Sequence, residues 1–145
     1  TICKVRIPPG LGEELILSWD EVREMNNGDI SFGAHTVNHP ILVNLRPEQA
    51  KHEIMQSKKD IERELRNKVM AFSYPNGDFN SKVVQLVREG GFTCAVSTYP
   101  HALVRTEDNP FILARIEAMD FSKLKFMLCG LWGDLHMMLT RIKSK

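Results

Sequence analysis

The segment Gly33-Ala34-His35-Thr36-Val37-Asn38-His39-Pro40 begins within a short apolar run, Ile30 to Ala34, and carries two histidines with three residues between them. The apolar run predicts a strand. Pro40 disfavours a helical conformation for His39, so the pair is expected in a loop after that strand rather than on a helix face. A turn in such a loop can bring both imidazole rings to one point.

Neutral imidazole nitrogens are good ligands for Zn²⁺ and similar divalent ions. Thr36 and Asn38 supply short polar groups that can fix the loop and orient a ring. Judged from these residues alone, a pair of histidines that merely forms hydrogen bonds in a loop is the stronger interpretation, because short motifs often match by chance.

Helices and strands are expected to alternate on both sides of this loop. Ser18 and Glu21 form an S-x-x-E capping box that predicts the start of a helix, and Asn26-Asn27-Gly28 predicts its end. Pro47 begins the next helix, with an apolar face and a charged face that is expected to be solvated. The apolar face comprises Ala50, Ile54, Ile61 and Leu65, and the charged face comprises Lys51, Glu53, Lys58, Lys59, Asp60 and Glu62.

Further strands are expected over Val69–Tyr74, Thr93–Thr98 and Ile112–Ile116. A helix starting at Asn80 or Ser81 and ending at Gly90-Gly91 lies between the first two, and a last helix is expected from Phe121 to about Ile142. Short apolar strands that alternate with amphipathic helices predict an α/β fold with a parallel sheet or barrel.

The bulk composition is that of one globular domain, residues 1–145, with 43% hydrophobic and 26% charged residues. The net charge of +1 gives no electrostatic footprint for nucleic acid, and no apolar run approaches the roughly 18 residues of a membrane span. The three cysteines include no C-x-x-C pair, which argues against a disulfide framework or a cysteine zinc site. The sequence leaves the cellular location open.

The histidine segment resembles the H-[ST]-x-x-H motif of the polysaccharide deacetylases, the NodB homology domain of carbohydrate esterase family 4. The resemblance implies that His35 and His39 bind a divalent metal ion. Zinc is the expected ion, and cobalt, nickel and manganese are the alternatives. It also implies the fold: a partial or distorted (β/α) barrel that lacks the first strand or strands. The resemblance runs over residues 15 to 116, and residues 117–145 form a C-terminal helix in this interpretation.

A second segment, Phe72-Ser73-Tyr74-Pro75-Asn76-Gly77, resembles the family's F-x-Y-P-Y-G motif. The resemblance implies that Tyr74, Pro75 and Asn76 line the substrate groove and that the Asn76 backbone N–H acts in catalysis by holding the oxyanion. The position of a family arginine is taken by Met70. The two helices around the motifs agree as well, since residues 17–25 resemble L-T-W-D-x-V-x-E-M and residues 86–92 resemble L-V-R-E-A-G-Y.

The family's general acid is a late histidine, and His136 is the candidate here. It lies in an apparent amphipathic helix with Leu131, Leu135, Met138 and Leu139, so a plain helix position is the stronger interpretation. The implied function is a metal-dependent hydrolase that removes N-acetyl groups from chitin-like or peptidoglycan-type amino-sugar polysaccharides or oligosaccharides.

One family motif is missing. T-F-D-D, whose aspartates supply a metal ligand and the general base, has no counterpart, and Thr1 to Gly12 contains no acidic residue. Three explanations stay open: loss of an upstream segment, a partner chain (a homo-oligomer included) that completes the barrel, or a degenerate domain. In the last case the alternative function is a non-catalytic carbohydrate-binding or scaffold domain of the same fold.

Overall fold

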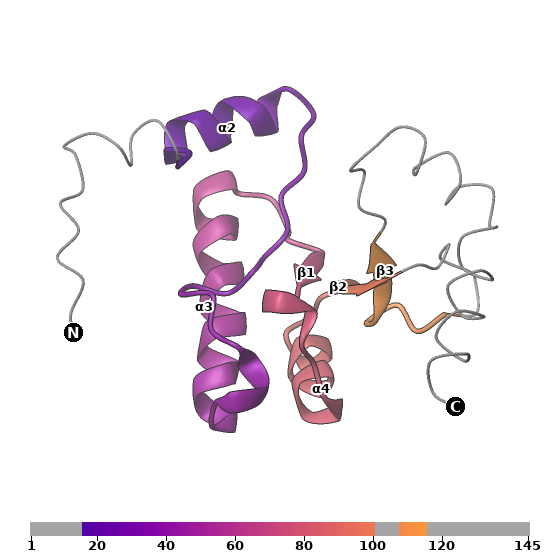
Figure 1. The fold of residues 1–145 in the computed structure, drawn as a ribbon. Helices are drawn as coiled ribbons and strands as arrows, with labels where there is room; N and C mark the ends of the chain where they lie inside the picture. Colours follow the sequence, from indigo (N-terminus) through magenta and orange to yellow (C-terminus); the bar gives the residue numbers. More distant parts are fainter. Residues whose placement is uncertain (1–15, 101–107, 116–145) are drawn as a thin grey trace, which may run out of the picture.

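Helices and short strands alternate along the residues that the structure, a computed structural model, describes: 16–100 and 108–115 (Figure 1). The elements are the α-helices α2 (Trp19–Asn27), α3 (Pro47–Leu65) and α4 (Ser81–Glu89), the 3₁₀ turns η1 (Leu42–Asn44) and η2 (Pro75–Gly77), and the strands β1 (Ala71–Ser73), β2 (Cys94–Pro100) and β3 (Leu113–Arg115). This is the α/β fold with a partial parallel sheet that the sequence predicts.

The sheet has the order β1-β2-β3, and both neighbouring pairs are parallel. The strand expected over Ile30–Ala34 is reduced to one residue, because the structure has a single parallel bridge from Ala34 to Phe72. The Ala34 N–H donates to the Ala71 carbonyl at 2.9 Å, and the Ser73 N–H donates to the Ala34 carbonyl at 2.8 Å. The segment before the histidine loop is therefore attached to the sheet at one point.

The hydrophobic core lies where α3 and α4 meet the sheet. Ile54 of α3, Val87 of α4 and Phe72 of β1 are each no more than 1% exposed. Full burial of an aliphatic or aromatic side chain contributes about 1.5–3 kcal/mol to stability. These contacts are therefore the main interactions that hold α3 and α4 against the sheet. The aromatic rings of Phe72 and Phe92 lie 5.3 Å apart between their centroids and connect β1 to the start of β2.

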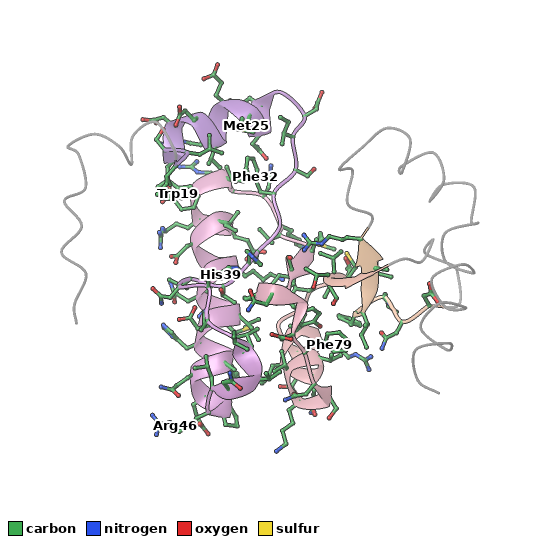
Figure 2. All side chains as sticks on the ribbon, in the orientation of Figure 1. Trp19, Met25, Phe32, His39, Arg46 and Phe79 are labelled. Atoms are coloured by element: carbon green, nitrogen blue, oxygen red, sulfur yellow. The ribbon has the colours of Figure 1, made fainter. Side chains whose placement is uncertain are left out.

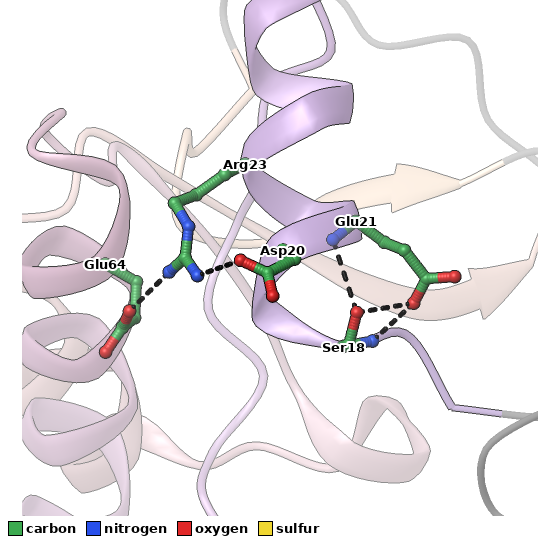
Figure 3. Close-up of polar contacts among 5 residues, drawn as sticks. All are labelled: Ser18, Asp20, Glu21, Arg23 and Glu64. Carbon is green, nitrogen blue, oxygen red and sulfur yellow. Dashed lines mark hydrogen bonds and ion pairs between the residues drawn. The ribbon is translucent and has the colours of Figure 1, made fainter.

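Helix α2 begins with the predicted capping box, in which the Glu21 N–H donates to the Ser18 hydroxyl and the Glu21 carboxylate accepts from the Ser18 N–H (Figure 3). Arg23 then contacts Asp20 on its own helix and Glu64 of α3, at 2.6 Å and 2.8 Å. Exposed ion pairs of this kind contribute little to stability because water and salt screen them, so the link orients α2 more than it stabilises it.

The other helix boundaries also follow the sequence prediction. Pro47 begins α3, and the Asn80 side chain accepts from the Val83 N–H to cap α4. The helix expected over residues 121–142, with His136, lies outside the described residues. Within the described part of the chain, no helix has the length and apolar character that crossing a membrane requires.

Candidate functional site

His35 and His39 lie side by side in the structure. Their ring centroids are 4.7 Å apart, with an angle of 73° between the ring planes. His35 directly follows the residue that bridges to β1, so the pair stands at the carboxyl end of the parallel strands, where active sites gather in α/β folds. In Figure 2, the loop that carries His39 crosses α3 in the view, and hydrogen bonds from Val37 and Asn38 to Glu53 attach this loop to the helix.

The orientation of the His35 ring is set by one hydrogen bond. Its Nδ1 lies 2.7 Å from the Ser73 carbonyl oxygen of β1. A carbonyl only accepts, so Nδ1 carries the proton and Nε2 of the neutral ring keeps its lone pair free for a ligand. The His35 side chain is exposed, which leaves Nε2 accessible. This Nδ1–carbonyl arrangement is the usual one behind metal-binding histidines.

The loop between the two rings has an unusual backbone. Thr36 and His39 have φ values of 66° and 54°, in the left-handed region that residues other than glycine rarely adopt. The Thr36 hydroxyl donates to the His35 carbonyl and accepts from the His39 N–H at 3.0 Å. Thr36 therefore fixes the loop, as its sequence position suggests.

Glu53 corrects the sequence analysis, which assigned it to the solvated face of its helix. It is buried, with 9% of its surface exposed, and it binds the histidine loop. Its carboxylate accepts from the N–H groups of Val37 and Asn38 and from the Asn38 side-chain amide. Burial by itself raises the pKa of Glu53, but the hydrogen bonds from Asn38 and Val37 outweigh it and hold the pKa below its usual range.

The helical spacing contains the signal that would have identified Glu53. Ala50, Glu53, Ile54 and Ser57 are the buried residues of α3, and they recur at the i, i+3, i+4 and i+7 positions of one face. A glutamate on that face either has a partner or destabilises the core.

The second motif forms a tight turn at the same end of the sheet. Asn76 is exposed and has φ 55°, and it lies three residues after Ser73, the residue that contacts His35. The Pro75 carbonyl accepts from the Asp78 N–H at 3.1 Å. The N–H and C=O of a trans peptide point in opposite directions, so this bond aims the Asn76 N–H away from Asp78.

Two hydroxyl groups of β2 hold the same turn. Thr98 donates to the Asn76 carbonyl at 2.7 Å, and Ser97 donates to the Gly77 carbonyl at 2.9 Å.

Tyr74 and Pro75 do not line an open groove, in contrast to the sequence prediction. Tyr74 is fully buried: its ring packs on Phe72 and Phe79, and its hydroxyl donates to the Phe111 carbonyl at 2.9 Å. Pro75 is buried as well. Residues alternate sides along a strand, so Tyr74 follows Phe72 into the core and the turn leaves Asn76 exposed.

The burial of Tyr74 predicts an alkaline loss of stability. Burial disfavours the phenolate and raises the pKa of Tyr74 from its ordinary value of 10.0 to about 12. The folded protein thus keeps its proton at a pH where the unfolded chain loses it. Stability from this group is complete below pH 10 and declines as the pH rises toward about 12, by about 2–3 kcal/mol in total.

Denaturant unfolding at pH 8 to 11.5 measures this decline in the wild type and in Tyr74→Phe. The variant is expected to be less stable at pH 8, because the Phe111 carbonyl loses its donor, and to show a smaller decline above pH 10. If the free energy of unfolding declines equally steeply above pH 10 in both proteins, the decline does not come from Tyr74.

The remaining predicted positions are less informative. Met70 lies before β1, at the opposite end of that strand from the histidine pair, and lines a cavity of about 480 Å³ with Lys58 and Gly91. Within residues 16–100 and 108–115, no cluster of three or more His, Cys, Asp or Glu side chains could hold a metal ion. His136 is outside the described residues.

Known proteins resemble this chain over the same region. The family model of the polysaccharide deacetylases matches residues 10–95. YxkH of Bacillus subtilis (strain 168), named as a polysaccharide deacetylase, is 29% identical over 101 residues, which cover 70% of this chain and 36% of YxkH.

Solved structures agree in fold. The deacetylase PplD of Streptococcus pyogenes, solved in complex with acetate, matches with a TM-score of 0.67 and 28% identity over 74% of this chain and 48% of PplD. The polysaccharide deacetylase BC0361 of Bacillus cereus has a TM-score of 0.69 and 22% identity over 77% of this chain and 36% of its own. The chain thus spans between about a third and a half of these relatives.

The match over residues 10–95 covers more than half of the chain and includes both the histidine loop and the turn at Asn76. The parallel sheet with helices, shared with solved deacetylases, is the NodB-type fold that the two sequence motifs imply. The chain belongs to the polysaccharide deacetylase family.

Proposed function

We propose that the protein is a metal-dependent hydrolase that removes N-acetyl groups from amino-sugar polymers of the chitin or peptidoglycan type. The observation that carries the proposal is the pairing of two exposed imidazole rings, 4.7 Å apart, at the carboxyl end of the sheet. Membership of the deacetylase family and the acetate in the related PplD structure support an acetylated substrate.

The chemistry of the pair fits a divalent metal ion. His35 is held in the tautomer that offers Nε2, and His39 is brought to it by the left-handed loop. The carbonyl of Ser73 contacts His35, and the hydroxyl of the same residue is the one buried side-chain oxygen without a hydrogen-bond partner among the described residues. Catalytic zinc sites use three protein ligands, so the proposal requires a further ligand from outside the described residues or from a partner chain.

A metal ion at this pair would lower the pKa of a bound water and polarise the acetyl carbonyl. The chain's own part is to hold the ligands and to offer the Asn76 N–H to the oxyanion, an interaction whose loss typically costs about 2.7–4 kcal/mol in other hydrolases. The hydrogen bonds to the Pro75 and Asn76 carbonyls keep that N–H in place without reorganisation. A general acid for the leaving amine, predicted at His136, stays a sequence prediction.

Calorimetric titration of the 145-residue chain with Zn²⁺ and Co²⁺ tests the metal site. His35→Ala and His39→Ala are each expected to weaken metal binding by about 100-fold. Removal of a residue that only orients a ligand weakens binding by up to about this factor, so removal of a ligand itself should have at least as large an effect. His52→Ala is the matched control, because this exposed histidine of α3 shares neither a hydrogen bond nor a ring contact with His35 or His39, and its loss should leave the affinity close to that of the wild type. Absence of binding to the wild type, or equal effects in all three variants, would overturn the metal site.

Acetate release from N-acetylglucosamine oligomers separates catalysis from binding. Metal-dependent release that disappears in His35→Ala supports the hydrolase. Oligomer binding without release, in a metal-loaded protein, would instead favour the carbohydrate-binding domain that the sequence analysis kept as the alternative.

A further inference from the structure

Among the residues that the structure describes, Glu53 is the buried side chain that carries a charge; the other buried polar side chains are the neutral Ser57 and Ser97. It lies in the second turn of α3, and its two carboxylate oxygens face the loop between the two histidines. A buried carboxylate is costly unless donors surround it, so its place in the core calls for a function.

The donors come from Val37 and Asn38, two of the three residues between the histidines. Oε2 of Glu53 accepts from the Val37 N–H and the Asn38 N–H, both at 2.9 Å, and Oε1 accepts from the Asn38 side-chain amide at 2.7 Å. Hydrogen bonds to an ionised acceptor are stronger than neutral ones. One side chain of α3 therefore holds the loop by three charge-assisted bonds.

The loop needs this support because its backbone is strained on both sides of the clamped residues. Thr36 and His39 adopt left-handed φ values, and a β-branched residue such as threonine rarely does so. Such conformations persist when the surroundings determine them, and they gather at functional sites. Released from Glu53, the loop would relax toward ordinary backbone angles, and the two rings would separate.

We propose that Glu53 is a positioning residue: its carboxylate holds loop 35–39 in the shape that keeps the His35 and His39 rings together before any ion binds. The inference rests on the proposed function in so far as the pair binds metal. Glu53 does not touch the ion; it acts through Val37 and Asn38 on the geometry of the two rings.

Glu53→Gln and Glu62→Gln form a matched pair of test variants. Glu62 is on the same helix and also accepts a backbone N–H, that of Val69 at 3.0 Å, but it lies away from the histidine loop. Glu53→Gln is expected to weaken Zn²⁺ and Co²⁺ binding by about 10-fold or more and to alter the visible spectrum of bound Co²⁺, whereas Glu62→Gln should change neither. Equal stability losses with unequal metal affinities would exclude a merely structural role.

Two further measurements keep the inference testable if a variant folds poorly or if the wild type binds no metal. Asn38→Ala removes the side-chain amide donor on the loop side and keeps the backbone N–H, so its effect on affinity should not add fully to that of Glu53→Gln. Amide hydrogen exchange of the metal-free chain should show protected Val37 and Asn38 amides in the wild type and faster exchange in Glu53→Gln.

The outcomes separate the two proposals. If the wild type binds no metal but Glu53 still protects the loop amides from exchange, the proposed function is contradicted and the positioning role is supported. Unchanged metal affinity and unchanged exchange of both amides in Glu53→Gln would overturn the positioning role, whatever the metal titration of the histidine variants shows.

Discussion

Gly77→Ala is expected to lower the free energy of unfolding by about 2–5 kcal/mol and to displace the turn that carries Asn76. Gly77 has φ +80°, where an L side chain is strained. A Cβ at this position would clash with the Thr98 Oγ1 and would lie 2.6 Å from the Thr98 backbone N. Thr98 lies in β2 between Val96, which pairs with β1 and β3, and Pro100, which pairs with β3, so the backbone is held on both sides of it.

The consequence for the site follows from Thr98, which also donates to the Asn76 carbonyl. Any shift that relieves the clash moves that hydroxyl, so the Asn76 N–H loses its fixed direction. Denaturant unfolding measures the stability, and the amide chemical shifts of the 75–78 turn report its displacement.

Gly91→Ala is the matched control for Gly77→Ala. Gly91 also has a left-handed φ, +71°, but the nearest atom to an added Cβ is the Lys58 Nζ at 3.6 Å, which is ordinary contact. The control therefore carries the backbone strain without the clash, at a cost of about 1–2 kcal/mol, partly offset by a less flexible unfolded chain. If both variants lose the same stability, the close approach of Thr98 to Gly77 is not what the turn depends on.

Phe72→Ala is expected to cost about 3–5 kcal/mol, because a fully buried aromatic side chain loses its burial and leaves a cavity. Phe72 is 1% exposed and packs against the rings of Tyr74 and Phe92 at centroid distances of 5.4 Å and 5.3 Å. Its backbone is also the position to which Ala34 bridges, so the histidine loop is attached to the same strand.

Thermal or denaturant unfolding of Phe72→Ala measures this loss. Met70→Ala, two residues earlier and 45% exposed, is the control and should cost less than about 1 kcal/mol. A cost for Phe72→Ala no larger than that of the control would mean that the core between the sheet and the helices is not the main source of stability.

Local signals in the sequence predicted the helices α2, α3 and α4 well. The capping box at Ser18, the first-turn Pro47 and the cap at Asn80 each satisfy or avoid backbone N–H groups within a few residues, so no distant contact is needed to place them. The strands were predicted in the right places but with different lengths. The run Ile30–Ala34 keeps one bridge, because a strand exists only where a partner offers hydrogen bonds.

The candidate site also has a part that local sequence signals predict and a part that depends on distant contacts. The H-x-x-x-H spacing and the proline after it indicated the loop and the two histidines, and that much lies within eight residues of chain. The contact between His35 and the Ser73 carbonyl joins residues 38 positions apart, and sequence spacing alone cannot specify it. Sequence spacing also cannot specify the position of Tyr74. Its hydroxyl donates to the Phe111 carbonyl, 37 positions away, and its ring lies in the core rather than in the expected groove.

By itself, then, the amino-acid sequence determined the family, the alternation of helices and strands, and the position of the two histidines in one loop. Caps, periodicity and short motifs act over a few residues, so no distant contact is needed to recognise them. Only the tertiary structure decided that Glu53 is buried under the histidine loop and that Asn76, rather than Tyr74, is exposed at the turn. Burial depends on which element packs against a side chain, and that is a property of the whole fold rather than of its neighbours in the chain.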